Sequence, residues 1–122
     1  MIEDYSKTLR EVPALISRES ELAEESRFYW QNAKEDLKQA EAVKYLETKA
    51  HNDKMTVSEI QAIVNADEIL YDKRMSIVCH ESEYRKHQGK IDSMIEALQA
   101  AKMLCRIDLN ERNANGEVYE RG

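Results

Sequence analysis

Two histidines in the second half of the chain, His80 and His87, are the side chains best suited to bind a metal ion. They stand seven residues apart, with Glu83 between them. In a helix this spacing places the two imidazoles about 10 Å apart along the axis, whereas the ligands of one zinc ion lie about 2 Å from it. We therefore predict no metal site, and we interpret both histidines as polar residues that set the register of a helix pair.

Other reactive side chains form no catalytic pattern. Cys79 and Cys105 are 26 residues apart and have no companion at metal-binding spacing, which indicates reduced thiols that pack between helices. No serine or cysteine stands beside a recognisable base motif, and no glycine-rich phosphate loop is present. The sequence thus predicts a protein that is not an enzyme, with no catalytic residue and no cofactor.

Basic side chains gather in two short stretches, one near the middle of the chain and one after residue 84. A single strand of nucleic acid is bound by cations that follow its backbone and by aromatic rings that stack on its bases. These stretches are therefore the candidate nucleic-acid-binding sites. The overall charge opposes nucleic-acid binding, because the net charge is -6 and residues 1–36 hold nine acidic and five basic side chains. The candidate residues are Lys44, Lys49, Lys54, Arg85, Lys86 and Lys90.

The amino-acid composition predicts the fold class of the protein that holds these residues. The chain has 122 residues, of which 34% are charged, with one proline and three glycines. Because proline and glycine, which interrupt helices and form turns, are this scarce, the sequence predicts an all-α protein and excludes all-β and α/β folds. No apolar run approaches the roughly 20 residues that cross a bilayer, and the first residues do not resemble a signal peptide. We expect a cytoplasmic protein with no membrane partner.

Helix-starting and helix-capping residues along the chain predict where each helix begins and ends. Pro13 suits the first turn of a long helix over 13–50. Thr56 and Glu59 form a capping box before a short helix over 57–64, and a break near Asn65 precedes a second long helix over 66–110. The sequence predicts one domain over 1–112 and a flexible tail over 113–122. The expected fold is a long antiparallel, coiled-coil-like helical hairpin that assembles into a helical oligomer.

Hydrophobic spacing supports this hairpin. The second long helix repeats an apolar residue every seven positions, which is the pattern of a heptad seam. Its members are Ile63, Leu70, Ile77, Tyr84, Ile91, Leu98 and Cys105. The first helix carries an apolar stripe that we expect to face this seam. Its members are Leu15, Leu22, Tyr29, Trp30, Ala33, Leu37, Ala40, Val43, Leu46 and Ala50.

Three consecutive aromatic residues, Phe28, Tyr29 and Trp30, cannot all face one seam. Successive residues of a helix are about 100° apart, so at least one ring must point elsewhere. One alternative is that the N-terminal segment, with Tyr5 and Leu9, folds over that ring. The alternative we favour is a subunit interface formed by Phe28, Tyr29 and Trp30, because aromatic residues supply large buried area at interfaces. The sequence therefore predicts a homo-oligomer.

The order of these features resembles a known family. Ala42-Val-Lys-Tyr-Leu-Glu-Thr-Lys49, then Lys54-Met-Thr-Val-Ser-Glu-Ile60, and later Ala97-Leu-Gln-Ala-Ala-Lys102 are similar to phage recombination mediators of the UvsY type. The resemblance covers roughly residues 20–110 and implies rings of small helical subunits. It implies single-stranded DNA, a recombinase and a single-strand-binding protein as partners. It places DNA binding near Lys44 and Lys49, although the denser basic and glycine run of the family is absent here.

Two classes of function follow. The first is an oligomeric, single-stranded-DNA-binding mediator that assists recombinase loading in phage recombination and repair. The second is a non-enzymatic phage adaptor or inhibitor that binds a host nuclease or defence complex through an acidic helical surface. A continuous surface formed by the six candidate cations favours the mediator. The same cations scattered or paired with carboxylates of the chain favour the adaptor.

Overall fold

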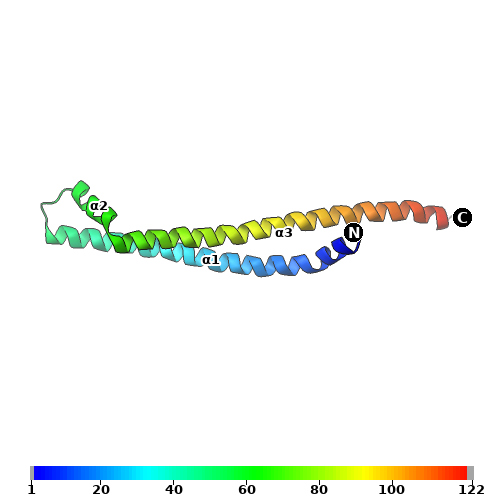
Figure 1. The fold of residues 1–122 in the computed structure, drawn as a ribbon, viewed down its shortest axis with the longest axis horizontal. Helices are drawn as coiled ribbons and strands as arrows, with labels where there is room; N and C mark the ends of the chain where they lie inside the picture. Colours follow the sequence, from blue (N-terminus) through cyan, green and yellow to red (C-terminus); the bar gives the residue numbers. More distant parts are fainter. Residues whose placement is uncertain (1, 121–122) are drawn as a thin grey trace. The chain divides into compact units, whose positions relative to one another are not determined.

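Three helices make up the fold. The computed structural model describes the backbone of residues 2–120 and the side chains of residues 5–114, and this part of the chain contains no strand. The helices are α1 (Ile2–His51), α2 (Val57–Ala66) and α3 (Glu68–Glu120) (Figure 1). The predicted all-α class and the two long helices with a short one between them are confirmed.

These helices contribute to two compact units. Unit 1 comprises the chain up to Leu22 and from His87 onward, and unit 2 comprises Ala23–Lys86. Within each unit, segments of α1 and α3 run antiparallel, because contacting residues rise in number on one helix as they fall on the other. Tyr5 contacts Asp108 and Glu19 contacts His87 in unit 1. In unit 2 the same trend relates Trp30 to Tyr84 and Lys44 to Asp67.

The start of the first helix was predicted too late. α1 begins at Ile2, so Pro13 lies inside the helix and not in its first turn. An interior proline removes one backbone hydrogen bond and crowds the preceding turn, at a cost of about 3 kcal/mol. Tertiary contacts offset this cost, because Leu9 and Val12 are half-buried and Tyr5 bonds to Asp108. Packing therefore outweighs the local helix preference.

Side chains that cap the backbone define the turn after α1 and the start of α2. After His51 the chain turns through Asn52, whose side chain accepts a hydrogen bond from the Lys54 N–H at 3.1 Å. Thr56 caps α2 by accepting from the Glu59 N–H at 3.2 Å, as predicted. The break before α3 lies two residues later than expected. Asp67, not Asn65, caps α3, since its carboxylate accepts from the Leu70 N–H at 3.0 Å.

The apolar core of unit 2 lies where α2 folds back beside α1 and the start of α3 (Figure 1). Ile60 and Val64 of α2 are exposed by only 1% and 2%, and Leu70 of α3 by 3%. Half-buried side chains of α1 and the turn complete this cluster: Leu37, Ala40, Tyr45 and Met55. The amphipathic α2 therefore covers the end of the helix pair, where a two-helix seam alone would be open to water.

The seven-residue repeat predicted from Ile63 onward is withdrawn from solvent at every member, Leu70 and Ile91 most fully. Six of the seven members lie on α3 and form its seam, whereas Ile63 lies on α2, before the break. On α3, the positions three residues after these members are also withdrawn from solvent, although most of them are polar. These positions are Lys73, His80, His87, Met94, Ala101 and Asp108.

The stripe predicted for the first helix was partly wrong. Trp30, Ala33, Leu37 and Ala40 are half-buried, as expected. The other predicted members are exposed: Leu15, Leu22, Tyr29, Val43, Leu46 and Ala50. The residues withdrawn from solvent instead form a second seven-residue pattern that includes polar members: Tyr5, Leu9, Val12, Ile16, Glu19, Ala23, Ser26, Trp30, Ala33, Leu37, Ala40 and Lys44. Exposed Leu15, Leu22, Tyr29 and Val43 keep the same period on a neighbouring line, which is why hydrophobicity alone selected them.

The end of α3 also lies beyond the predicted boundary. The helix continues to Glu120, whereas the sequence predicted a helix to residue 110 and a tail from 113. Once a helix is formed, each further residue adds a hydrogen bond for little additional ordering, so a polar stretch can extend it. Residues 121–122 lie outside the described residues, and the flexibility predicted for 113–122 stays a prediction.

Gly89 lies inside α3 on an exposed position. Its backbone has no positive φ, and a Cβ added there would meet nothing within 4 Å. A glycine inside a helix can mark a kink, a close approach of another segment, or mere tolerance on an exposed face. The open space around Gly89 agrees with the last of these.

We therefore expect Gly89→Ala to raise the free energy of unfolding by about 1 kcal/mol, because alanine restricts the unfolded backbone and favours the helix. Urea denaturation of the full chain measures this change. A lower stability of the Ala variant would show that a neighbour requires the space at this position.

Adjacent residues at the start of α3 provide a matched test of the core. Leu70 is 3% exposed and Ile69 is 68% exposed. Leu70→Asp should destabilise unit 2 by several kcal/mol, because it buries an unpaired charge. Ile69→Asp should change the stability by no more than about 0.5 kcal/mol. Equal melting temperatures for the two variants would contradict the packing described here.

Candidate functional site

Polar pairs across the helix seam are the most specific contacts in unit 1. Glu19 of α1 and His87 of α3 are largely withdrawn from solvent, with side-chain exposures of 14% and 17%, and their Oε1 and Nδ1 atoms form a hydrogen bond. Lys90 Nζ lies 4.0 Å from the same carboxylate. The hydrogen bond from His87 is the main reason that the pKa of Glu19 lies below its ordinary value, with Lys90 adding to this effect. Glu19 is therefore held as a carboxylate.

A second polar pair lies toward the other end of unit 1. The Tyr5 hydroxyl donates to Asp108 Oδ2 at 2.7 Å, and Arg112 Nε lies 3.1 Å from the same oxygen. The hydrogen bond to the Asp108 carboxylate, together with burial, raises the pKa of Tyr5. Because Tyr5 and Asp108 occupy seam positions on facing helices, this pair aligns α1 with α3 in the same way as Glu19 and His87.

In unit 2, aromatic stacking aligns α1 with α3. Trp30 stacks on Tyr84 with ring centroids 5.7 Å apart, and Lys34 Nζ lies 3.6 Å above the indole. Tyr29 stacks on His80 with centroids 6.1 Å apart. The indole N–H of Trp30 is buried and has no hydrogen-bond partner. Trp30 is therefore fixed by contacts within its own unit.

Both histidines predicted to be seam residues thus lie in the seam, His80 against Tyr29 and His87 against Glu19. Among the described residues, no group of three or more His, Cys, Asp or Glu side chains could hold a metal ion. The described helices also include none that is long and apolar enough to span a bilayer. Cys79 is an exposed free thiol and Cys105 a half-buried one.

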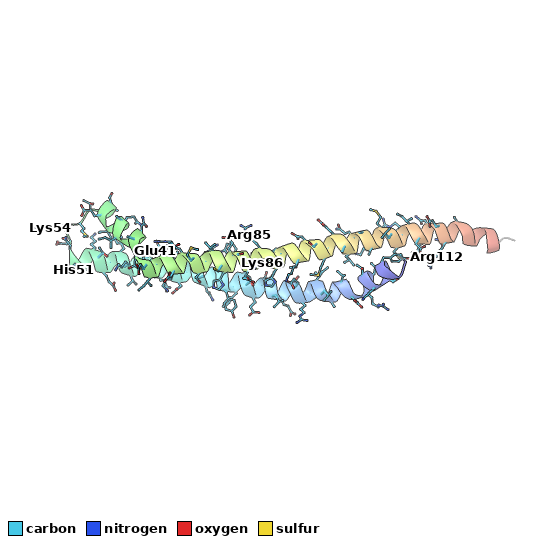
Figure 2. The ribbon with its side chains drawn as sticks, in the orientation of Figure 1. Glu41, His51, Lys54, Arg85, Lys86 and Arg112 are labelled. Carbon is cyan, nitrogen blue, oxygen red and sulfur yellow. The ribbon has the colours of Figure 1, made fainter. Side chains whose placement is uncertain are left out.

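Five of the six candidate cations belong to unit 2, where they do not form one surface, and Lys90 belongs to unit 1. Within unit 2, Lys44, Lys49 and Lys54 lie at the turn end, whereas Arg85 and Lys86 lie on α3, about 25 Å along the helix from its start. Figure 2 shows Lys54 and His51 at the turn and Arg85 and Lys86 well along α3.

Four of the six cations are also held by carboxylates of the chain. Lys44 Nζ lies 3.3 Å from Asp67 Oδ2, and Lys90 approaches Glu19 as described above. Arg85 donates to Glu81 at 2.7 Å and 3.0 Å. Lys86 Nζ lies 3.5 Å from Glu83 Oε1. The Leu70 N–H bond, with Lys44 as a smaller contribution, lowers the pKa of Asp67, so Lys44 faces a carboxylate that remains ionised.

Lys49 and Lys54 differ from these four. Both side chains are exposed, and neither has an ion-pair partner among the described residues. Lys49 lies in the last turn of α1, where the helix dipole favours a cation. They are the two candidate cations that remain available to a ligand.

Of the three predicted oligomer-interface residues, two are exposed and one packs inside the unit. Phe28 is 62% exposed and Tyr29 is 49% exposed, and their rings form an edge-to-face pair with centroids 6.0 Å apart. Trp30 instead stacks on Tyr84. The expectation that at least one ring points away from the seam is therefore confirmed, but Trp30 is not an exposed interface residue of this chain.

Two surface grooves in unit 2 flank the core. One lies between α1 and α2 and has a volume of about 430 Å³; Tyr45, Leu46, Gln61 and Val64 are among its lining residues. The other, of about 300 Å³, lies beside Val43, Lys44, Asp67 and Ile69. Neither contains a nucleophile paired with a base, so we assign them no chemistry.

Sequence reasoning missed several of these contacts. Glu19 and Asp108 were not singled out, because polar seam residues do not contribute to a hydrophobic period, and Tyr5 was considered only as part of a segment folding over an exposed ring. Their signal is positional, since each continues the seven-residue spacing of an apolar neighbour. Tyr71, Met75 and Val78, which form an exposed apolar line on α3, were also missed. Their spacing of four and then three residues is the signal that could have identified them.

Comparison with known proteins finds no matching family model, no similar curated protein and no similar solved structure.

The Glu19–His87 contact predicts a specific acid sensitivity. Because folding lowers the pKa of Glu19, the unfolded chain binds this proton at higher pH than the folded chain does. The stabilisation is complete above the ordinary pKa of a glutamate and is lost as the pH falls through the lowered pKa of Glu19 in the folded chain. The difference in melting temperature between the wild type and Glu19→Gln should therefore be large at neutral pH and should shrink in acid.

Glu21→Gln provides the control for this comparison, since Glu21 is exposed on α1 and has no partner among the described side chains. Its melting temperature should follow that of the wild type at each pH. A Glu19→Gln effect that is the same at neutral and acid pH would contradict the role assigned to the carboxylate.

Proposed function

We propose that the chain is a non-enzymatic adaptor or inhibitor that binds another protein through the surface of its helices. The observation that carries this proposal is the internal pairing of Lys44, Arg85, Lys86 and Lys90 with carboxylates of the chain. A DNA strand would have to displace these carboxylates, and the net charge of -6 would oppose its approach.

Exposed carboxylates of α1 in each unit support binding to a basic partner. Glu21 in unit 1 and Glu25 in unit 2 are exposed and have no partner among the described side chains. Glu24 contacts only Arg27, at 3.5 Å and with both side chains more than half exposed, so this pair contributes little. Such carboxylates attract a partner with a basic surface. A nuclease or defence complex that ordinarily binds nucleic acid has such a surface.

The second candidate function is the single-stranded-DNA-binding recombination mediator, with a recombinase and a single-strand-binding protein as its protein partners. It is favoured by one specific observation, the unpaired and exposed Lys49 and Lys54 beside His51 at the turn (Figure 2). Two cations alone bind a strand weakly. This function therefore requires a homo-oligomer that repeats the turn and multiplies each contact.

Binding of a labelled single strand separates the two functions. At about 50 mM salt the adaptor should show no binding to any single-stranded sequence, whereas a mediator binds and its log K falls by about 0.7 per neutralised phosphate as log salt rises. Lys49→Glu combined with Lys54→Glu should abolish mediator binding for every DNA sequence, because phosphate contacts do not read bases. Lys102→Glu, on an exposed position of α3, is the matched control.

The adaptor proposal has its own positive test. The chain should inhibit digestion of DNA by a purified non-specific nuclease, used as a probe with a basic DNA-binding surface. Reversal of the exposed acids by Glu21→Lys, Glu24→Lys and Glu25→Lys should weaken inhibition by at least about tenfold, which corresponds to about 1.4 kcal/mol. Strand binding that depends on Lys49 and Lys54, without nuclease inhibition, would replace the adaptor with the mediator.

A further inference from the structure

Phe28 on α1 has the most exposed aromatic ring among the described residues, at 62%. It belongs to unit 2. The neighbouring Tyr29 ring packs against it edge to face, and Tyr29 in turn stacks on His80 of α3. The Phe28 ring is therefore supported on one side by rings of its own unit and is otherwise largely open to solvent.

The side of α1 that carries Phe28 is acidic. Residues three, four and seven positions apart share one face of a helix. Within unit 2 this spacing groups Phe28 with five other exposed residues, which together we call the Phe28 face: Glu24, Glu25, Gln31, Asn32 and Glu35. Its three charges are all carboxylates. Glu25 and Glu35 have no ion-pair partner among the described residues, and Glu24 has only its exposed pair with Arg27.

Cations of the same stretch of α1 stand beside the Phe28 face and not on it. They are about 80–120° round the helix from Phe28: Arg27, Lys34 and Lys38. Among the described contacts, only Arg27 reaches a carboxylate of the face. On the other flank, Asp36 is neutralised by Lys73 of α3, whose Nζ lies 2.6 Å from Asp36 Oδ2. The Phe28 face thus presents an open ring among carboxylates that are mostly unpaired.

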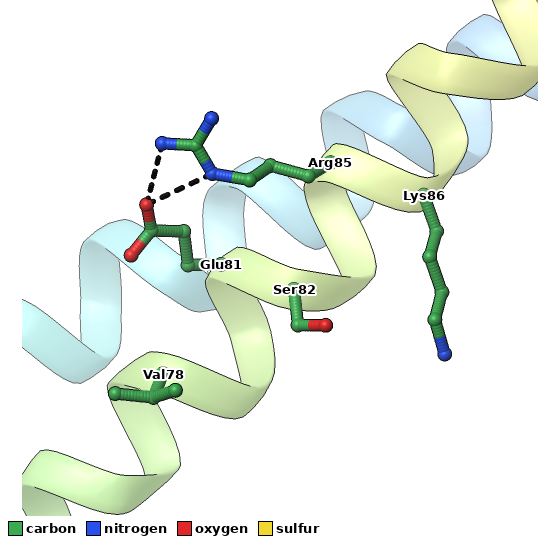
Figure 3. A pocket seen from close by; sticks show the side chains of 5 residues that line it. All are labelled: Val78, Glu81, Ser82, Arg85 and Lys86. Atoms are coloured by element: carbon green, nitrogen blue, oxygen red, sulfur yellow. Dashed lines mark hydrogen bonds and ion pairs between the residues drawn. The ribbon is translucent and has the colours of Figure 1, made fainter.

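The exposed apolar line on α3 differs in its charges. A shallow hollow of about 450 Å³ at the end of that line is lined by residues of both signs. Figure 3 shows Arg85 bonded to Glu81 on one side of it and Lys86 extending on the other, with Val78 and Ser82 between them. Charge therefore selects no partner for this hollow, whereas on the Phe28 face it selects a cation.

We propose that the Phe28 face binds an arginine side chain of a basic partner protein. The planar guanidinium stacks on the Phe28 ring, and its N–H groups donate to the carboxylate of Glu24 or Glu25, one helical turn away. A guanidinium makes both contacts at once, whereas the ammonium of lysine is a compact charge that does not stack. The site rests on the proposed adaptor function, and it specifies the basic partner as one that presents an arginine.

Two labelled peptides of equal charge, hexaarginine and hexalysine, test the contact with the full chain. Fluorescence anisotropy at low salt should show that hexaarginine binds about threefold more tightly than hexalysine, which is the effect of an exposed cation–π contact. Phe28→Leu keeps an apolar side chain but removes the ring, so it should abolish this preference without changing helicity. Tyr71→Leu is the matched control, because it removes a similarly exposed ring from α3 and should keep the preference.

The carboxylates are tested by removing charge. Glu24→Gln combined with Glu25→Gln should weaken the binding of both peptides. The matched control, Glu47→Gln combined with Glu68→Gln, removes the same charge from exposed positions elsewhere in unit 2 and should weaken binding less. An equal loss in the two double variants would show that only net charge attracts the peptides, and it would overturn the site.

Three further results would overturn the arginine contact: no binding of either peptide, equal affinities for the wild type, or a preference that survives Phe28→Leu. A wild-type mass of twice 14.2 kDa that falls to 14.2 kDa in Phe28→Asp would assign the face to a second copy of the chain and would also overturn it. Failure of the adaptor function is read separately, from nuclease digestion that the wild type does not slow.

Discussion

The structure depends on a narrow seam in which α1 meets α3 in one register within each unit. Only six described residues are buried, and all are apolar: Ala23, Ile60, Val64, Leu70, Ile91 and Ala101. Apolar heptads tolerate a shift by one repeat, because every seventh position looks alike. Polar side chains do not, since a shifted helix would leave a half-buried carboxylate without a partner. Glu19 with His87, and Tyr5 with Asp108, therefore specify the alignment in unit 1.

Because the seam is narrow, most of the surface of both helices is exposed to partners. A seam only two positions wide leaves the other sides of both helices to solvent, with apolar residues such as Phe28, Val78 and Ile69 among those exposed. The described residues form shallow grooves without a paired nucleophile and base. The surfaces open to a partner include exposed carboxylates on α1, the exposed apolar residues Tyr71, Met75 and Val78 on α3, and the exposed lysines Lys49 and Lys54 at the turn.

Sequence reasoning predicted the elements that rest on a strong period or on capping chemistry. The heptads from Ile63 to Cys105 and the Thr56 cap follow from spacing and side-chain type alone. The start of α1 could not be predicted, because contacts of Tyr5, Leu9 and Val12 outweigh the penalty of Pro13. The pairing of Arg85 and Lys86 within α3 was readable from their spacing to Glu81 and Glu83, whereas Lys44 with Asp67 required the fold.

The most direct test of this account is the exchange of partners across the seam of unit 1. Glu19→His places two imidazoles face to face, and His87→Glu places two carboxylates face to face, so each single variant should melt below the wild type. The double variant restores one acid opposite one imidazole, and its melting temperature at neutral pH should exceed that of both single variants. A double variant that is no more stable than the weaker single variant would contradict the claim that this pair specifies the register.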